Sequence, residues 1–95
     1  MTPERHIYWL LSFSDPARPS GEQWLGCLYL QAETLKGAIT TAHAMKLNPG
    51  GEVLAIHFST TTDLTPYAYR LITDPDESAN LEIDDIETLP QIVGN

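Results

Sequence analysis

Residues 34–59, TLKGAITTAHAMKLNPGGEVLAIHFS, hold a helical and an extended pattern in direct succession. From Thr34 onward, apolar side chains recur three and four residues apart, which places them on one side of an amphipathic helix. That side consists of Leu35, Ala38, Ile39, Ala42 and Met45. Asn48-Pro-Gly-Gly51 ends the helix, because Asn tolerates the left-handed conformation after a helix and Pro cannot continue one.

The residues after this turn alternate as a strand does. In residues 52–59 the larger apolar side chains favour one face as the core face, made of Leu54, Ile56 and Phe58. The other face then carries Val53, Ala55 and His57. Two further strands are predicted earlier in the chain, at residues 6–14 and 24–32, separated by a Pro- and Gly-containing loop. The first of them is almost continuously apolar, which is typical of a central strand covered on both faces.

A fourth strand is predicted at residues 68–73, and beyond it a short strand at 81–83 or a helical turn after Asp84. The order is then ββαββ, which indicates an α+β fold with a mostly antiparallel sheet of four to five strands and one helix on one face. A chain of 95 residues is expected to form a single domain, 1–95, with an acidic segment at 74–95. One core between sheet and helix is predicted from Trp9, Leu11, Phe13, Leu35, Ile39, Leu54, Ile56 and Phe58.

The sheet face opposite the helix is expected to be open. Period-2 alternation predicts that Tyr8, Leu10 and His57 project onto it, joined by Tyr29 and Tyr69 from the neighbouring strands. An open face with three tyrosines and a histidine suits a small molecule or a peptide. These four residues form the alternative candidate site.

Charge is distributed very unevenly. The chain carries 13 acidic and 5 basic residues, a net charge of −8. Residues 1–59 contribute five acids and four bases, whereas residues 60–95 contribute eight acids and Arg70 alone. Such a charge repels phosphate backbones and anionic lipids, so direct binding to nucleic acid or to a membrane is not expected. The short apolar run behind the N-terminus and the single Cys27, predicted to be a buried, inert thiol, favour a cytoplasmic protein.

No catalytic or metal site is predicted from residue spacing. His6, His43 and His57 have no acid or nucleophile at a telling offset, and a zinc site needs three or four convergent ligands. Residues 74–85 partly imitate a calcium loop, but Ala79 replaces the Gly of the sharp turn and Asp85 replaces the bidentate Glu. We therefore expect no enzyme activity, no cofactor and no tight calcium binding.

The acidic segment is the main candidate site for a partner. Residues two apart on a strand repeat at ~6.8 Å, comparable to two ~3.4 Å steps along a DNA strand, so a fixed row of carboxylates resembles a row of phosphates. Leu81, Ile83 and Ile86 interrupt the acids and are expected to pin them to the domain. The predicted partner-binding residues are Asp74, Asp76, Glu77, Glu82, Asp84, Asp85 and Glu87.

A short, acidic, single-domain chain without a visible active site resembles the phage-encoded anti-CRISPR proteins in format, over its whole length. Trp24-Leu-Gly26 and Asn48-Pro-Gly-Gly-Glu52 also resemble a pattern of small bacterial and phage proteins. The resemblance implies a monomer in the host cytoplasm whose target is a CRISPR surveillance complex of type I, with its positively charged DNA path. It supplies no motif from which functional residues carry over.

Three hypotheses follow from the sequence. The first is a stoichiometric inhibitor that mimics DNA and occupies a nucleic-acid-binding groove through its acidic surface. The second is a small-molecule or peptide-binding module that uses the open sheet face. The third is an accessory subunit of a phage or bacterial assembly.

Overall fold

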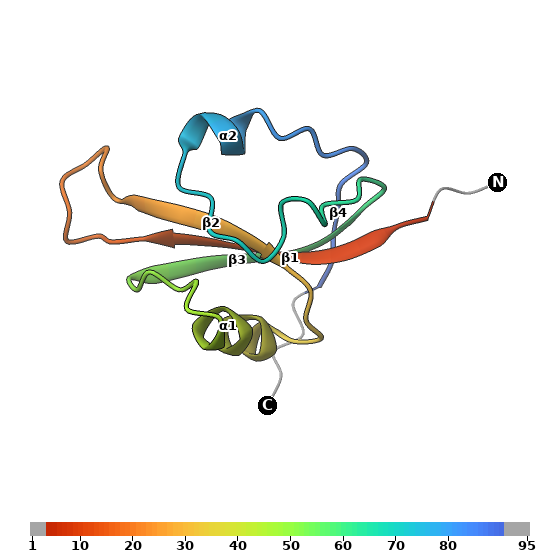
Figure 1. Cartoon of the computed structure of the whole chain (residues 1–95), viewed down its shortest axis with the longest axis horizontal. Helices are drawn as coiled ribbons and strands as arrows, with labels where there is room; N and C mark the ends of the chain where they lie inside the picture. Colours follow the sequence, from red (N-terminus) through yellow and green to blue (C-terminus); the bar gives the residue numbers. More distant parts are fainter. Residues whose placement is uncertain (1–3, 91–95) are drawn as a thin grey trace.

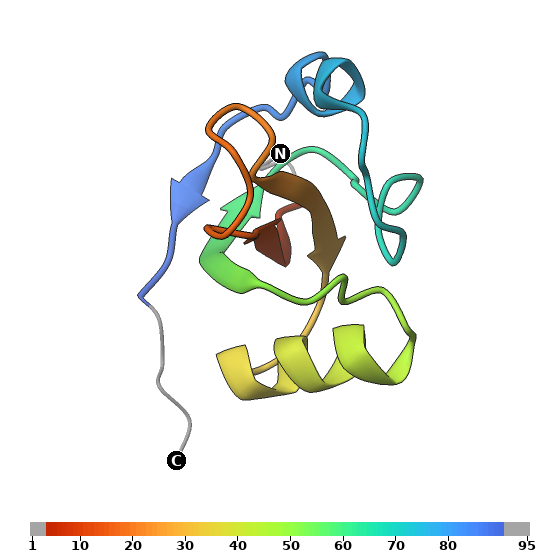
Figure 2. The same cartoon turned by 90° about the vertical axis from the view of Figure 1, so that its left-hand side faces the viewer.

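The computed structural model describes residues 4–90, which form a small α+β fold around a four-stranded antiparallel sheet. Its strands are β1 (His6–Ser14), β2 (Trp24–Leu30), β3 (Glu52–Thr60) and β4 (Glu87–Thr88), in the order β2-β1-β3-β4. The helices are α1 (Leu35–Ala44) and α2 (Pro75–Ala79). Figure 1 shows α1 on one side of the sheet and α2 on the other, and the end view in Figure 2 shows the same three layers.

β1 is the central strand of the sheet, as its continuous apolarity predicts. It pairs with β2 on one side and with β3 along its whole length on the other. Trp9, Leu11 and Phe13 point toward α1, while Tyr8 and Leu10 point to the opposite face. Both faces are covered, which is why polar and apolar residues do not alternate along this strand.

α1 begins where the sequence predicts, because the Thr34 hydroxyl accepts a hydrogen bond of 3.0 Å from the amide of Gly37. It ends earlier than predicted. Lys46, at φ 60°, and not Asn48, takes the left-handed conformation after the helix. The amide of Leu47 then bonds the carbonyl of Ala42 at 2.9 Å, closing a Schellman-type end. Asn48 instead bonds the amide of Gly50 with its side chain.

The predicted core is correct for β1 and wrong for β3. Trp9, Leu11 and Phe13 are buried with Ala38 and Ala42 beneath the sheet. On β3 the register pairs Leu11 with Ala55 and Trp9 with His57, so these residues, and not Leu54, Ile56 and Phe58, share the α1 face. Leu54 is 67% exposed and Ile56 is 37% exposed, while Phe58 is buried on the opposite face. Leu35 packs against the core edge and Ile39 is half-buried.

The strand predicted at residues 68–73 does not form. This segment touches the edge of β2 only through two isolated bridges, Tyr29 with Ala68 and Cys27 with Ile72. Between them Tyr69 has φ 59°, which interrupts the extended backbone that a continuous strand needs. The fourth strand is β4, beside β3, so the ββαββ order and a fifth strand are not found in residues 4–90.

The acidic segment also differs from prediction, since neither the strand at 81–83 nor a helical turn after Asp84 forms. Instead α2 begins after Asp74, whose side chain accepts from the amide of Asp76 at 2.9 Å, with Pro75 in the first turn. Asp followed by Pro is a helix-start signal that was present in the sequence.

The face opposite α1 is covered at Tyr8, Tyr29 and Phe58 and stays exposed only at Leu54 and Ile56 of β3, among the residues described. Residues 61–86, here called the upper layer, cross it from the end of β3 to the start of β4 (Figure 1). Leu64 and Ile72 from this layer are buried against Tyr8, Tyr29 and Phe58 of the sheet. The fold therefore has two apolar clusters, one on each side of the same sheet.

Candidate functional site

The acidic segment is attached to the sheet by Arg5, directly before β1. The guanidinium of Arg5 donates to the Ser59 hydroxyl at 3.1 Å, to the Asp85 carbonyl at 2.7 Å and to the Asp85 carboxylate at 2.7 Å. These residues come from both ends of the chain and from β3. One planar, multiply donating side chain thus holds the end of the upper layer against the sheet.

Asp84, next to this clamp, is fixed through its backbone on both sides. Its carbonyl accepts a short hydrogen bond from the Thr60 hydroxyl, and its amide donates to the Thr62 hydroxyl at 2.8 Å. Leu81 and Ile83 pack against the apolar cluster beneath the upper layer. Leu81 and Ile83 therefore pack against the domain as predicted, whereas Ile86, predicted to do the same, is 55% exposed.

Most of the predicted partner-binding carboxylates are exposed, but they are not equivalent. Arg5 forms ion pairs with Asp85 and with Glu87, and Arg70 forms one with Glu77, whose side chain is partly covered. Within residues 4–90 no ion pair involves the four remaining acids. These are Asp74, Asp76, Glu82 and Asp84, all exposed.

Asp63 belongs to the same surface and was missed by the sequence analysis. It follows Thr62, which bonds Asp84, and its carboxylate accepts a hydrogen bond of 2.9 Å from the amide of Thr65. Hydrogen bonds from the Thr65 side chain and amide lower the pKa of Asp63 below its ordinary value, and the nearby His6 contributes in the same direction. The Asp-x-Thr sequence at residues 63–65 predicts a turn. No short-range pattern in the sequence predicts that this turn lies next to Asp84.

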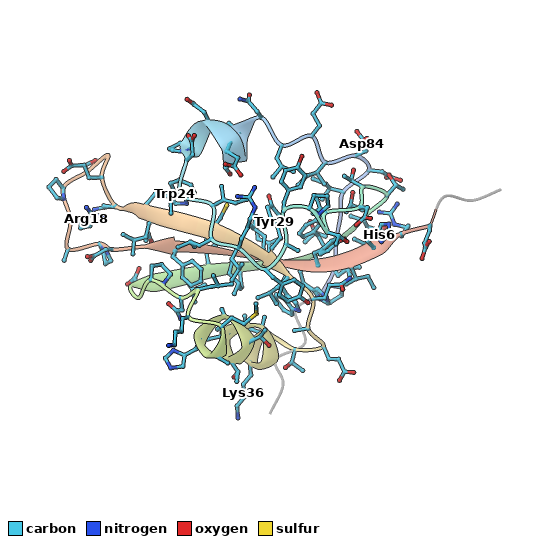
Figure 3. The ribbon with its side chains drawn as sticks, viewed as in Figure 1. His6, Arg18, Trp24, Tyr29, Lys36 and Asp84 are labelled. Atoms are coloured by element: carbon cyan, nitrogen blue, oxygen red, sulfur yellow. The ribbon has the colours of Figure 1, made fainter. Side chains whose placement is uncertain are left out.

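The two outer layers of the molecule carry opposite charge. The upper layer holds seven acids and one base, Arg70. Residues 34–51, which include α1, hold Lys36 and Lys46 and no acid. Figure 3 shows Lys36 and Asp84 on opposite sides of the sheet. The negative potential is therefore concentrated on the side of the molecule where α2 lies.

The alternative site is not assembled as predicted. Tyr8 and Tyr29 are 2% and 5% exposed, because the upper layer covers them. His57 lies on the α1 face, stacked on Trp9 with ring centroids 4.3 Å apart. Tyr69 is exposed, and its hydroxyl is at the backbone of Gln31. The expectation of an exposed face carrying all four residues is therefore wrong.

Cys27 is buried beneath α2, where its sulfur lies 3.7 Å from the Ser78 hydroxyl. Burial raises the pKa of this thiol above its ordinary value, against a smaller opposing effect of the bond to Ser78. The thiol is thus protonated at neutral pH, which makes it a weak nucleophile.

Residues 4–90 bring together no group of three or more His, Cys, Asp or Glu side chains suited to a metal ion. In the stretch that imitates a calcium loop, residues 75–79 are helical and Asp74 caps that helix. Among the described helices, none combines the length and apolarity needed to cross a membrane.

The assignment of the acidic surface as a candidate site comes from the structure of this chain. Comparison with known proteins finds no family model, no curated protein and no solved structure that matches the chain.

Proposed function

We propose that the protein is a stoichiometric inhibitor that binds a basic nucleic-acid-binding groove of a partner protein with the acidic surface of its upper layer, as a mimic of DNA. The observation that carries this proposal is the set of four exposed carboxylates that form no ion pair within residues 4–90, namely Asp74, Asp76, Glu82 and Asp84, the last on a backbone hydrogen-bonded to Thr60 and Thr62. An anchored array loses little chain entropy on binding, unlike a disordered acidic tail.

The resemblance in format to anti-CRISPR proteins makes a type I CRISPR surveillance complex, in the cytoplasm of a host cell, the first target to test. Its DNA path is positively charged, so carboxylates and phosphates compete for the same side chains. The proposed mechanism needs no catalysis and no cofactor. The concentration of charge on one side of the molecule also favours oriented, salt-sensitive association with such a groove.

The test is a gel shift of target DNA with the purified surveillance complex, in which the protein is added before or after the DNA. The decisive variant replaces the four unpaired acids by their amides, D74N/D76N/E82Q/D84N. Asp85 and Glu87 are left intact, because their removal would also break the contacts to Arg5. The matched control, E4Q/E22Q/E33Q/E52Q, removes four exposed acids outside the upper layer and reaches the same net charge.

We expect the wild type and the control variant to block DNA binding when added first, more weakly at high salt, and to bind little once DNA is loaded. The variant D74N/D76N/E82Q/D84N is expected to inhibit at least about tenfold less well. Basic side chains of the groove would lose water on binding it and would gain no carboxylate in return. Equal inhibition by the two variants, or binding only to the DNA-loaded complex, would refute the DNA-mimic mechanism.

A further inference from the structure

The upper layer leaves part of the sheet face beneath it uncovered, next to the acidic residues. Two cavities of about 580 and 250 Å³ lie between the layer and the sheet, and Leu10 of β1 lines both of them. The smaller cavity lies between Phe58 of the sheet and Ile83 and Ile86 at the end of the layer. Because the two cavities meet at Leu10, they form one groove along the sheet face.

The side of this groove that faces solvent is apolar. Leu54 is 67% exposed, Ile86 is 55% exposed and Ile56 is 37% exposed. Leu54 and Ile56 are alternate residues of β3 and share one face of the sheet, while Ile56 and Ile86 line the smaller cavity together. These three residues are here called the apolar patch. Large apolar side chains that are exposed together are associated with binding surfaces.

Acidic side chains border the apolar patch. Residues 82–87, which include Ile86, contain four acids and no base. Glu52 is exposed and lies two residues before Leu54, on the same face of β3. Glu82 and Asp84 form no ion pair within residues 4–90, and Figure 3 shows Asp84 on the side of the sheet opposite α1. A basic group beside the patch would meet carboxylates, whereas a nucleic acid or an anionic lipid would be repelled.

The position of the patch on a sheet face favours one conformation of its occupant. The backbone hydrogen-bonding groups of a strand point to its edges, so the face offers only side chains. A segment lying on it must satisfy its own backbone hydrogen bonds, which a helix does and an extended peptide does not. Side chains one turn apart on a helix are about 5–6 Å apart, close to the ~6.8 Å between alternate strand residues such as Leu54 and Ile56.

We propose that the apolar patch and its acidic border bind a basic, amphipathic helix of a protein partner. The apolar side chains of this helix lie in the groove, and its Lys and Arg side chains contact the carboxylates. The inference goes beyond the proposed function, because a mimic of DNA needs no apolar contact. It applies equally to a helix that does not line a DNA path, so it is tested on a helix alone.

Four labelled peptides of about four helical turns each test the proposal by fluorescence anisotropy with the full chain. The first, KLLKKLLKKLLKKL, is basic and amphipathic as a helix. The second, KLKLKLKLKLKLKL, has the same composition but is amphipathic as a strand. The third, KAAKKAAKKAAKKA, keeps the charge without large apolar side chains, and the fourth, ELLEELLEELLEEL, reverses the charge. We expect saturable binding of the first peptide and at least about tenfold weaker binding of the other three.

The variant L54S/I86S removes two side chains of the patch and keeps every charge. The matched control, I7S/M45S, removes two apolar side chains of similar exposure, 50% and 45%, outside the patch. We expect L54S/I86S to bind the first peptide at least about tenfold more weakly and the control to bind it as the wild type does. In NMR spectra of the wild type, the shifts caused by this peptide should centre on the patch.

Four outcomes would overturn the proposal. The first is no saturable binding, and the second is an equal effect of the two double variants. The third is equal binding of the helical and the alternating peptide, which would assign the patch to an extended segment. The fourth is a wild-type dimer in sedimentation that L54S/I86S converts to a monomer, which would assign the patch to a second copy of the chain. None of these outcomes decides the DNA-mimic mechanism, which the gel shift tests separately.

Discussion

Arg5 connects the acidic segment to the sheet over long distances in the sequence. It contacts Ser59 in β3, 54 positions away, and Asp85, 80 positions away. Its ion pair with Asp85 is largely exposed and contributes little by itself. The hydrogen bonds to the Ser59 hydroxyl are partly buried, the one to the Asp85 carbonyl is exposed, and the charged donor strengthens all of them. Arg5 acts mainly as a fork with several donors and less as a point charge.

Arg5→Ala is therefore expected to lower the free energy of unfolding by about 1–2 kcal/mol and to loosen the end of the upper layer first. Hydrogen exchange measures this locally: the amide of Asp84 should lose protection, while the amide of Trp9 in β1 should not. Arg5→Lys keeps the charge without the fork and should restore only a small part of the loss. Full rescue by Lys would mean that charge, and not geometry, holds the segment.

At the scale of elements, the turn between α1 and β3 depends on two glycines with different demands. Gly50 and Gly51 both have positive φ, 91° and 74°. A Cβ atom on Gly50 would meet nothing within 4 Å, whereas one on Gly51 would overlap the carbonyl oxygen of Ser14, at the end of β1. The turn therefore brings β3 directly against β1, and only hydrogen fits at Gly51.

Gly50→Ala should cost about 1 kcal/mol, the conformational penalty for a left-handed Ala. Gly51→Ala should cost at least about 1 kcal/mol more, because it carries a similar penalty and also displaces Ser14. Urea denaturation of the two variants isolates the steric contact, since each serves as the control for the other. Equal losses would show that β1 and β3 tolerate a wider separation at this end.

The upper layer covers a sheet face although α2 is the only regular element described in it. Its attachment consists of buried side chains such as Leu64 and Ile72 and of two bridges to β2. Gly26 in β2 allows the bridge between Cys27 and Ile72, because a Cβ atom on Gly26 would lie 2.9 Å from the carbonyl oxygen of Ile72. A layer held at separate points leaves cavities between them.

For the whole molecule, the buried thiol and phenol make stability depend on alkaline pH. Burial raises the folded pKa of Cys27 above 9.0 and that of Tyr29 above 10.0. Because the folded state favours the neutral forms, their contribution is fully present below the unfolded pKa values and is lost as pH rises through the raised folded values.

The free energy of unfolding from urea melts is accordingly expected to decline above about pH 9. In Cys27→Ala the onset should move toward about pH 10, where Tyr29 begins to titrate in the unfolded chain. A flat profile up to about pH 11 in the wild type would contradict the burial of both groups.

Short-range patterns determined much of this fold. β1 has the bounds that its apolar run predicts, and α1 begins at the cap residue that the helical period indicates. These features depend on residues a few positions apart, whose spacing and hydrogen-bonding groups are visible in the sequence. The seven predicted acids of the candidate site are equally visible, because they lie within residues 74–87, whereas Asp63 lies outside this run.

The tertiary structure decided the rest. Alternation in β3 defines two faces but not which one meets α1, and the register with β1 places small Ala55 there and leaves Leu54 exposed. That Asp85 is neutralised, while Asp84 forms no ion pair within the described residues, depends on Arg5 at the other end of the chain. Likewise, the burial of Tyr29 depends on where the upper layer lies. Such contacts join residues with no relation in spacing, so only the folded chain brings them together.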